Sequence, residues 1–142
     1  MPETSVFIQQ FEVRGRDFAN AGRASTAIKE ILKEIGIPPA VVRRAAIAAY
    51  EAEMNVVLYA RQGTVELQVS PAEVRLLVRD QGDGIPDIEL AMQEGYSTAS
   101  EEIREMGFGA GMGLPNIRKN ADEFRIESVV GQGTELDIRI RL

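Results

Sequence analysis

Residues 107–120 read GFGAGMGLPNIRKN, and glycine occupies every second position at the start of this stretch. Glycine costs about 0.5–1 kcal/mol relative to alanine inside regular structure, so such a run needs a reason. A helical pattern follows it, and we predict a helix over residues 114–122. Free N–H groups and the positive end of the dipole make the start of a helix a favourable place for an anion. We interpret the stretch as the phosphate end of a binding site; a surface loop is the alternative.

This glycine stretch differs from two widespread phosphate motifs. It lacks the Gly-Lys-Ser/Thr sequence of a P-loop. It also does not follow a strand inside a βαβ unit, so it does not fit the dinucleotide-binding fingerprint. Because the P-loop lysine is absent and the net charge of the chain is −6, a phosphate site here would depend on backbone N–H groups.

Outward from this stretch, the pattern of apolar residues predicts clustered helices between hairpins. We expect Gly36 to end the first helix and Gly63 to break the second. The predicted elements are a strand at 4–13, helices from Asp17 to Ile35 and from Pro38 to about Ala60, strands at 64–70 and 73–80, a short helix at 86–93, the helix at 114–122, and strands at 124–130 and 134–142. This order predicts an α+β fold, a two-layer α/β sandwich whose mixed, mostly antiparallel sheet has helices on one face.

The composition limits what the protein can be. With 142 residues, we expect a single domain over 1–142. The chain has neither cysteine nor histidine, which excludes disulfides, thiolate metal sites and a phosphohistidine enzyme. No block of like charges suggests nucleic-acid binding, and no apolar run reaches the roughly 18 residues of a membrane span. The N-terminus does not resemble a signal peptide, so we expect a cytoplasmic protein.

Two polar residues, Glu51 and Asn55, lie one turn apart on the second predicted helix, which is otherwise rich in alanine and valine. An asparagine offers the hard oxygen that Mg²⁺ prefers, and a glutamate can orient or deprotonate a nucleophile. These residues therefore indicate a metal and water site. The alternative is a solvated helix face, with Glu53 beside it.

Asp80 ends a predicted strand within VRDQGDGIPD (78–87) and is followed by Gly82 and Gly84. Asp and Gly are also common in ordinary turns, and that remains the alternative interpretation. In a binding site, the carboxylate would accept a hydrogen bond from a buried ligand amine. The glycines would let the backbone approach a flat ring closely.

Together, these features resemble the Bergerat ATP-binding fold of the GHKL superfamily, which includes gyrase B, Hsp90, histidine kinases and MutL. The helix with Glu51 and Asn55, the Asp80 motif, the glycine stretch and a late Gly133-Thr134 match successive nucleotide boxes over nearly the whole chain. Within the superfamily, the chain is similar to the small anti-sigma-factor serine kinases and most similar to RsbT-type switch kinases. The segments that carry this similarity are Gly-Tyr-Ser-Thr (95–98), Gly-Phe-Gly-Ala-Gly (107–111), Asp-Glu-Phe (122–124) and NVVLYA (55–60).

The resemblance implies roles for these residues. Asn55 would coordinate Mg²⁺, Glu51 would be the base or positioning group for the attacking hydroxyl, and Asp80 would accept from the adenine amino group. Thr134 would support the adenine through Asp80 or water, and a lid from about Gly95 to Gly113 would close over the phosphates. The other implied nucleotide-binding positions are Gly82, Gly84, Ile85, Gly107, Gly109, Ala110, Gly111, Met112, Gly113 and Leu114.

The resemblance also implies a function, an ATP-dependent serine/threonine protein kinase of the anti-sigma-factor or switch type. Its expected substrate is a Ser or Thr on a STAS-domain partner, an anti-sigma-factor antagonist or stressosome protein, which it would regulate by partner switching. A sigma factor or a PP2C-type phosphatase is a further candidate partner; no nucleic acid and no membrane are expected. One alternative is a nucleotide-gated protein-binding module with little turnover, and another is an α+β domain whose glycines only form turns.

Overall fold

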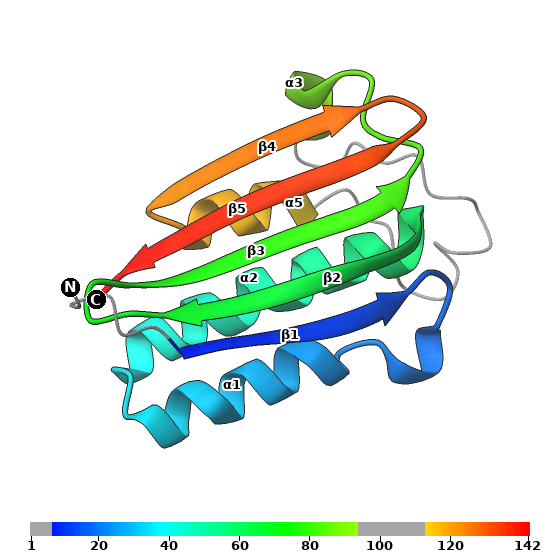
Figure 1. Cartoon of the computed structure of the whole chain (residues 1–142). Helices are drawn as coiled ribbons and strands as arrows, with labels where there is room; N and C mark the ends of the chain where they lie inside the picture. Colours follow the sequence, from blue (N-terminus) through cyan, green and yellow to red (C-terminus); the bar gives the residue numbers. More distant parts are fainter. Residues whose placement is uncertain (1–6, 94–112) are drawn as a thin grey trace.

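The computed structural model describes residues 7–93 and 113–142 of the chain (Figure 1). In chain order its elements are β1 (Phe7–Arg14), the 3-10 helix η2 (Phe18–Asn20), α1 (Arg23–Ile35), α2 (Pro39–Tyr59), β2 (Ala60–Val69), β3 (Glu73–Gly82), α3 (Ile88–Ala91), α5 (Gly113–Asn120), β4 (Glu123–Val129) and β5 (Gly133–Arg141). No helix within these ranges is long and apolar enough to cross a membrane.

The sheet has five strands in the order β1-β2-β3-β5-β4, and α1, α2 and α5 lie on one of its faces (Figure 1). This confirms the α+β fold. The prediction of a mixed sheet is wrong for the described strands, since each neighbouring pair is antiparallel. The physical reason is that α1 and α2 form a pair between β1 and β2, which returns the chain to the end of the sheet where β1 stops. The next strand must then run in the opposite direction.

The core lies between the sheet and α2, which α1 and α5 flank. The alanines of α2 allow close packing, and Ala45, Ala48 and Ala52 are fully buried. Apolar side chains from the inner face of the sheet complete this layer, because successive strand residues point to opposite faces. Among them are Val65, Leu67, Leu76, Val78, Leu136, Ile138 and Ile140.

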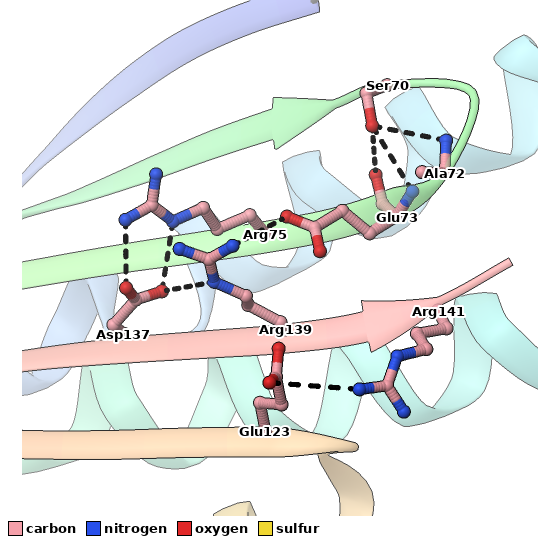
Figure 2. Close-up of polar contacts among 8 residues, drawn as sticks. All are labelled: Ser70, Ala72, Glu73, Arg75, Glu123, Asp137, Arg139 and Arg141. Carbon is pink, nitrogen blue, oxygen red and sulfur yellow. Dashed lines mark hydrogen bonds and ion pairs between the residues drawn. The ribbon is translucent and has the colours of Figure 1, made fainter.

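The other face of the sheet is polar and carries a ladder of charges across β3, β5 and β4 (Figure 2). Arg75 binds Asp137 through two hydrogen bonds, Nε to Oδ1 at 2.9 Å and Nη2 to Oδ2 at 2.8 Å. Arg139 lies 3.5 Å from both Asp137 and Glu73. These charged side chains bind one another on the face of the sheet that the helices do not cover. The candidate site residues lie on the helix side and are therefore separate from this ladder.

Glycines set the start of the first helix and correct one prediction about the second. The first helix begins at Arg23 rather than directly after Asp17, because Gly22 has a φ of 95° and interrupts the chain after the η2 turn. Gly63 does not break the second helix, which already ends at Tyr59; it lies inside β2, opposite Asp80. Gly36, with a φ of 92°, ends α1 as predicted.

Candidate active site

Glu51 and Asn55 lie on α2 and are both half-buried. The Glu51 carboxylate accepts a hydrogen bond from the side-chain amide of Asn116, Nδ2 to Oε2, at 2.7 Å. Asn55 lies against the first residue of α5, because a Cβ added to Gly113 would be 2.9 Å from Asn55 Oδ1. Glu51 and Asn55 therefore meet the N-terminal half of α5, the helix that follows the glycine stretch.

The helix α5 is fixed to α2 along its length. Leu114 and Ile117 are buried in the core, with exposed fractions of 8% and 0%. At the other end of the helix, Arg44 of α2 donates from Nε to the Asn120 carbonyl at 3.0 Å. Asn120 in turn donates to the carbonyl of Asn116 at 2.9 Å. The amide that holds Glu51 is thus carried by a well-anchored helix.

Asp80 lies on the helix-covered face of β3 and is also half-buried. Its Oδ1 accepts the Thr134 backbone N–H at 3.1 Å. Burial raises the pKa of Asp80, while hydrogen bonds from the N–H groups of Thr134 and Gly82 oppose that rise. Burial therefore outweighs these hydrogen bonds in its effect on the pKa, and perturbed pKa values of this kind are common in functional sites.

Glycines bring the backbone close to Asp80 from two sides. A Cβ at Gly133 would lie 2.0 Å from the Asp80 carbonyl oxygen, so no other residue fits there without a shift. A Cβ at Gly63 would lie 3.1 Å from Asp80 Cβ and 3.1 Å from Val56 Cγ1. Gly63 therefore lies between Asp80 and the turn of α2 that carries Asn55, and it links the two halves of the candidate site.

The loop after β3 is tied to the β4–β5 hairpin next to Asp80. The N–H of Ile85 donates to Ser128 Oγ at 2.7 Å, and the Gly131 N–H donates to the Asp83 carbonyl at 2.8 Å. Gly84 has a φ of 78°, and a Cβ there would lie 2.6 Å from the Val129 carbonyl oxygen. Glycine is required at this position by conformation and by space.

The structure places the expected site residues in three groups. Glu51, Asn55 and Gly113 meet between α2 and α5, whereas Asp80 and Thr134 meet between β3 and β5. Gly82 packs against the end of α2, since a Cβ there would lie 2.9 Å from the Tyr59 carbonyl oxygen. Five expected positions lie outside the described residues: Gly107, Gly109, Ala110, Gly111 and Met112. The binding and catalytic roles of all these residues stay predictions.

Glu53 does not fit the alternative interpretation, in which it lies beside a solvated helix face. It is only 2% exposed, and its carboxylate accepts the N–H groups of Gly22 at 3.0 Å, Ala24 at 3.2 Å and Ser25 at 2.9 Å. These donors belong to the start of α1, which has no side-chain cap of its own. A signal was present in the sequence, because the residues one turn before and after Glu53, Ala49 and Val57, are apolar.

Asn116 and Ser128 were not among the expected site residues. Asn116 contacts a residue 65 positions away, and Ser128 contacts one 43 positions away. No local pattern encodes pairings over such separations. Within the described ranges, no group of three or more Asp, Glu, His or Cys residues could hold a metal ion. A magnesium ion beside Asn55 would consequently need ligand oxygens from a bound phosphate or from water.

Comparison with known proteins finds similar sequences over most of the chain. A family model described as "Histidine kinase-like ATPase domain" matches residues 16–140. The serine/threonine-protein kinase RsbT of Bacillus subtilis is 33% identical over 112 residues, which cover 76% of this chain and 78% of that protein. An anti-sigma F factor of Thermoanaerobacter sp. is 32% identical over 116 residues, covering 82% of this chain and 73% of that protein. An anti-sigma F factor of Geobacillus stearothermophilus is 32% identical over 114 residues, covering 80% and 67%.

Proposed function

Because this chain belongs to the family of histidine kinase-like ATPase domains, we propose that it is an ATP-dependent serine/threonine protein kinase of the anti-sigma-factor or switch type. The observation that carries the proposal is the placement of Glu51 and Asn55 beside the first turn of α5, with Asp80 on the other side of Gly63. A nucleotide bound there would meet the Asp80 carboxylate at its adenine and the Asn55 amide at its metal ion. The Glu51 carboxylate would lie near the hydroxyl that receives the phosphate.

Asp80 supports the end of the site that would hold the adenine. Ionised Asp80 is half-buried, and its two N–H donors do not offset the cost of its burial. The exocyclic amine of adenine would give this carboxylate a further donor. Gly84 and Gly133 let the β4–β5 hairpin pack closely against the loop after β3 and against the backbone of Asp80, which holds this carboxylate in place.

Asn55 supports the phosphate end. Its Oδ1 faces Gly113, the last glycine of the 107–113 run, so a side-chain oxygen lies at the start of a helix. Asn55 would hold a magnesium ion together with phosphate oxygens, which fits the lack of a carboxylate cluster among residues 7–93 and 113–142. When bound, such an ion neutralises charge on the phosphates during transfer. The N–H groups at the start of α5 favour the same negative charge.

Glu51 supports the chemical step. In the proposed reaction, a Ser or Thr hydroxyl oxygen of the partner forms a bond to the γ-phosphorus of ATP, and the bond from that phosphorus to the bridging oxygen breaks. ADP leaves, and the hydroxyl proton passes to Glu51. Asn116 donates to Oε2 of Glu51, so it fixes the plane of the carboxylate and leaves Oε1 as the oxygen to take the proton.

The proposed partner is a STAS-domain protein, an anti-sigma-factor antagonist or stressosome protein. A sigma factor or a PP2C-type phosphatase is a further candidate. The support is that relatives with similar sequences are named RsbT kinase and anti-sigma F factor. A cytoplasmic setting, where ATP is abundant, is part of the same proposal.

A second candidate, a nucleotide-gated binding module, is favoured by the relatives named anti-sigma factors, a name for a protein that acts by binding. It needs the nucleotide site but not Glu51 as a base. The intact Glu51–Asn116 contact favours the kinase.

Transfer of labelled γ-phosphate from ATP to a STAS-domain protein encoded beside this chain distinguishes the two. We expect labelling by the wild type, a loss of at least about a hundredfold in Glu51→Ala, and no change in Glu34→Ala, which replaces an exposed glutamate on α1. Nucleotide-dependent partner binding with no labelling by the wild type would overturn the kinase and leave the binding module.

A further inference from the structure

Ser128 joins separate chain segments at the end of the proposed nucleotide site that would hold the adenine. It lies on β4, and its side chain is half-buried on the face of the sheet that the helices cover. Its hydroxyl oxygen accepts the Ile85 N–H at 2.7 Å and lies 3.2 Å from the Gly133 carbonyl oxygen and 2.9 Å from Thr134 Oγ1. Three hydrogen bonds therefore meet at one hydroxyl group.

The donors and acceptors in these bonds can be assigned by elimination. A serine hydroxyl has one proton and two lone pairs. The Gly133 carbonyl can only accept, so the Ser128 proton points to it. The Ile85 N–H can only donate, so it occupies one lone pair. What remains on Ser128 is a single lone pair, and the Thr134 hydroxyl must therefore be the donor in the 2.9 Å contact.

This assignment fixes what Thr134 can offer to a ligand. Its hydroxyl proton is used by Ser128, and its backbone N–H is used by the Asp80 carboxylate at 3.1 Å. Thr134 Oγ1 consequently presents lone pairs only. The Asp80 carboxylate is an acceptor as well, so both side chains at this end of the site call for a ligand edge that brings hydrogen-bond donors.

We propose that Ser128 is a specificity-determining residue. By fixing the direction of the Thr134 hydroxyl, it leaves only hydrogen-bond acceptors at the end of the site that would hold the purine. The site would therefore select a 6-amino purine over a 6-oxo purine. Adenine brings an amine with two N–H donors to this place. Guanine brings a carbonyl oxygen, which would face two acceptors and leave buried lone pairs unpaired. This inference rests on the proposed function, because it requires that the site holds a nucleotide.

Calorimetric titration of the full chain with ATP and with GTP, each with magnesium in excess, tests the inference. We expect wild-type protein to prefer ATP. In Ser128→Ala the Thr134 hydroxyl can turn and donate to a 6-oxo group, so the ratio of the two dissociation constants should fall by roughly tenfold, the size of one hydrogen bond. In a Thr134→Val background the Ser128→Ala change should leave the ratio unaltered, because Ser128 would act through that hydroxyl.

Ser128→Thr serves as the matched variant, since it keeps the hydroxyl and the partner of the Ile85 N–H. It should retain the wild-type ratio. An unchanged ratio of the two dissociation constants in Ser128→Ala would overturn the inference. If ATP binding and GTP binding were both weakened by the same factor, Ser128 would only support the loop. Failure of wild-type protein to bind either nucleotide would instead overturn the proposed function, and the selectivity inference with it.

Discussion

Asn116 of α5 and Glu51 of α2 form a hydrogen bond of 2.7 Å between side chains that are 65 residues apart. The helix that follows the glycine stretch thereby holds the group proposed to take the proton. A charge-assisted hydrogen bond of this kind fixes the orientation of the carboxylate as well as adding binding energy. Any movement of α5 relative to α2 would change the position of Glu51.

Replacing Asn116 by Ala should slow phosphoryl transfer with little effect on nucleotide affinity. We expect kcat to fall by about tenfold or more, because the carboxylate loses its orientation, while the dissociation constant for ATP stays within about twofold. Single-turnover transfer and calorimetry measure the two quantities. Asn120→Ala is the control on the same helix, since its amide contacts only the backbone of Asn116 among the partners seen here. Equal rates in Asn116→Ala and wild type would show that the contact has no part in catalysis.

Replacing Glu53 by Ala should unfold much of the protein at moderate temperature. Three N–H groups at the start of α1 would lose their acceptor in the core, and each buried donor left unsatisfied costs about 1–3 kcal/mol. Glu53→Gln keeps one oxygen acceptor and should lose less. Urea denaturation gives the free energy of unfolding, and Glu34→Ala should change it by less than about 0.5 kcal/mol. Similar stability of Glu53→Ala and Glu34→Ala would contradict the capping role.

Replacing Asp80 by Asn should stabilise the nucleotide-free protein while it weakens ATP binding. Burial raises the folded-state pKa of Asp80 above its ordinary value of 3.8. The folded state then binds this proton more tightly than the unfolded state does, so the contribution of Asp80 is most favourable below pH 3.8 and is lost as the pH rises through the raised value. At neutral pH the amide removes this cost and still accepts the Thr134 N–H. Thermal unfolding of the variant and the wild type, with and without ATP, measures both effects. If Asp80→Asn has a lower Tm than the wild type in the absence of ATP, the predicted stabilisation is refuted.

Replacing Asp137 by Asn should reduce stability at neutral pH and make no difference in acid. The Arg75 guanidinium holds the pKa of Asp137 below 3.8, so this stabilisation is present above that pH and is lost as the pH falls through the lowered value. The pair is partly solvated, with side-chain exposures of 28% for Arg75 and 13% for Asp137, and we expect a loss of about 1 kcal/mol at pH 7. Denaturation across pH 2–7 tests this, and a pH-independent difference would contradict it.

Local signals in the sequence predicted most of the fold. Alternation along 134–142 and the turn before it gave the last hairpin, and Gly36 ended α1 as expected. The features that were wrong depend on contacts with distant residues. Gly63 reads as a helix breaker, yet its role is to leave room between Val56 and the strand that carries Asp80. The uniform antiparallel sheet follows from the way the two helices return the chain, which periodicity does not reveal.

The same limit applies to the site. Residue type and spacing indicated Glu51, Asn55 and Asp80, because a carboxylate or amide on an apolar helix or at a strand end needs a partner. Asn116 binds Glu51 and Ser128 binds Thr134, and both pairs lie on segments that meet only in the folded chain. The small polar side chains of Asn116 and Ser128 would be unremarkable on any exposed surface, so the sequence offers no reason to single them out.

Calorimetric titration with ATP, in the presence and absence of magnesium, tests the central claim most directly, namely that Asn55 and Asp80 serve one nucleotide site. We expect wild-type protein to bind ATP more tightly with magnesium, Asn55→Ala to bind with an affinity that no longer responds to magnesium, and Asp80→Asn to lose affinity in both conditions. Absence of binding to the wild type at millimolar ATP, or wild-type behaviour of both variants, would contradict the account.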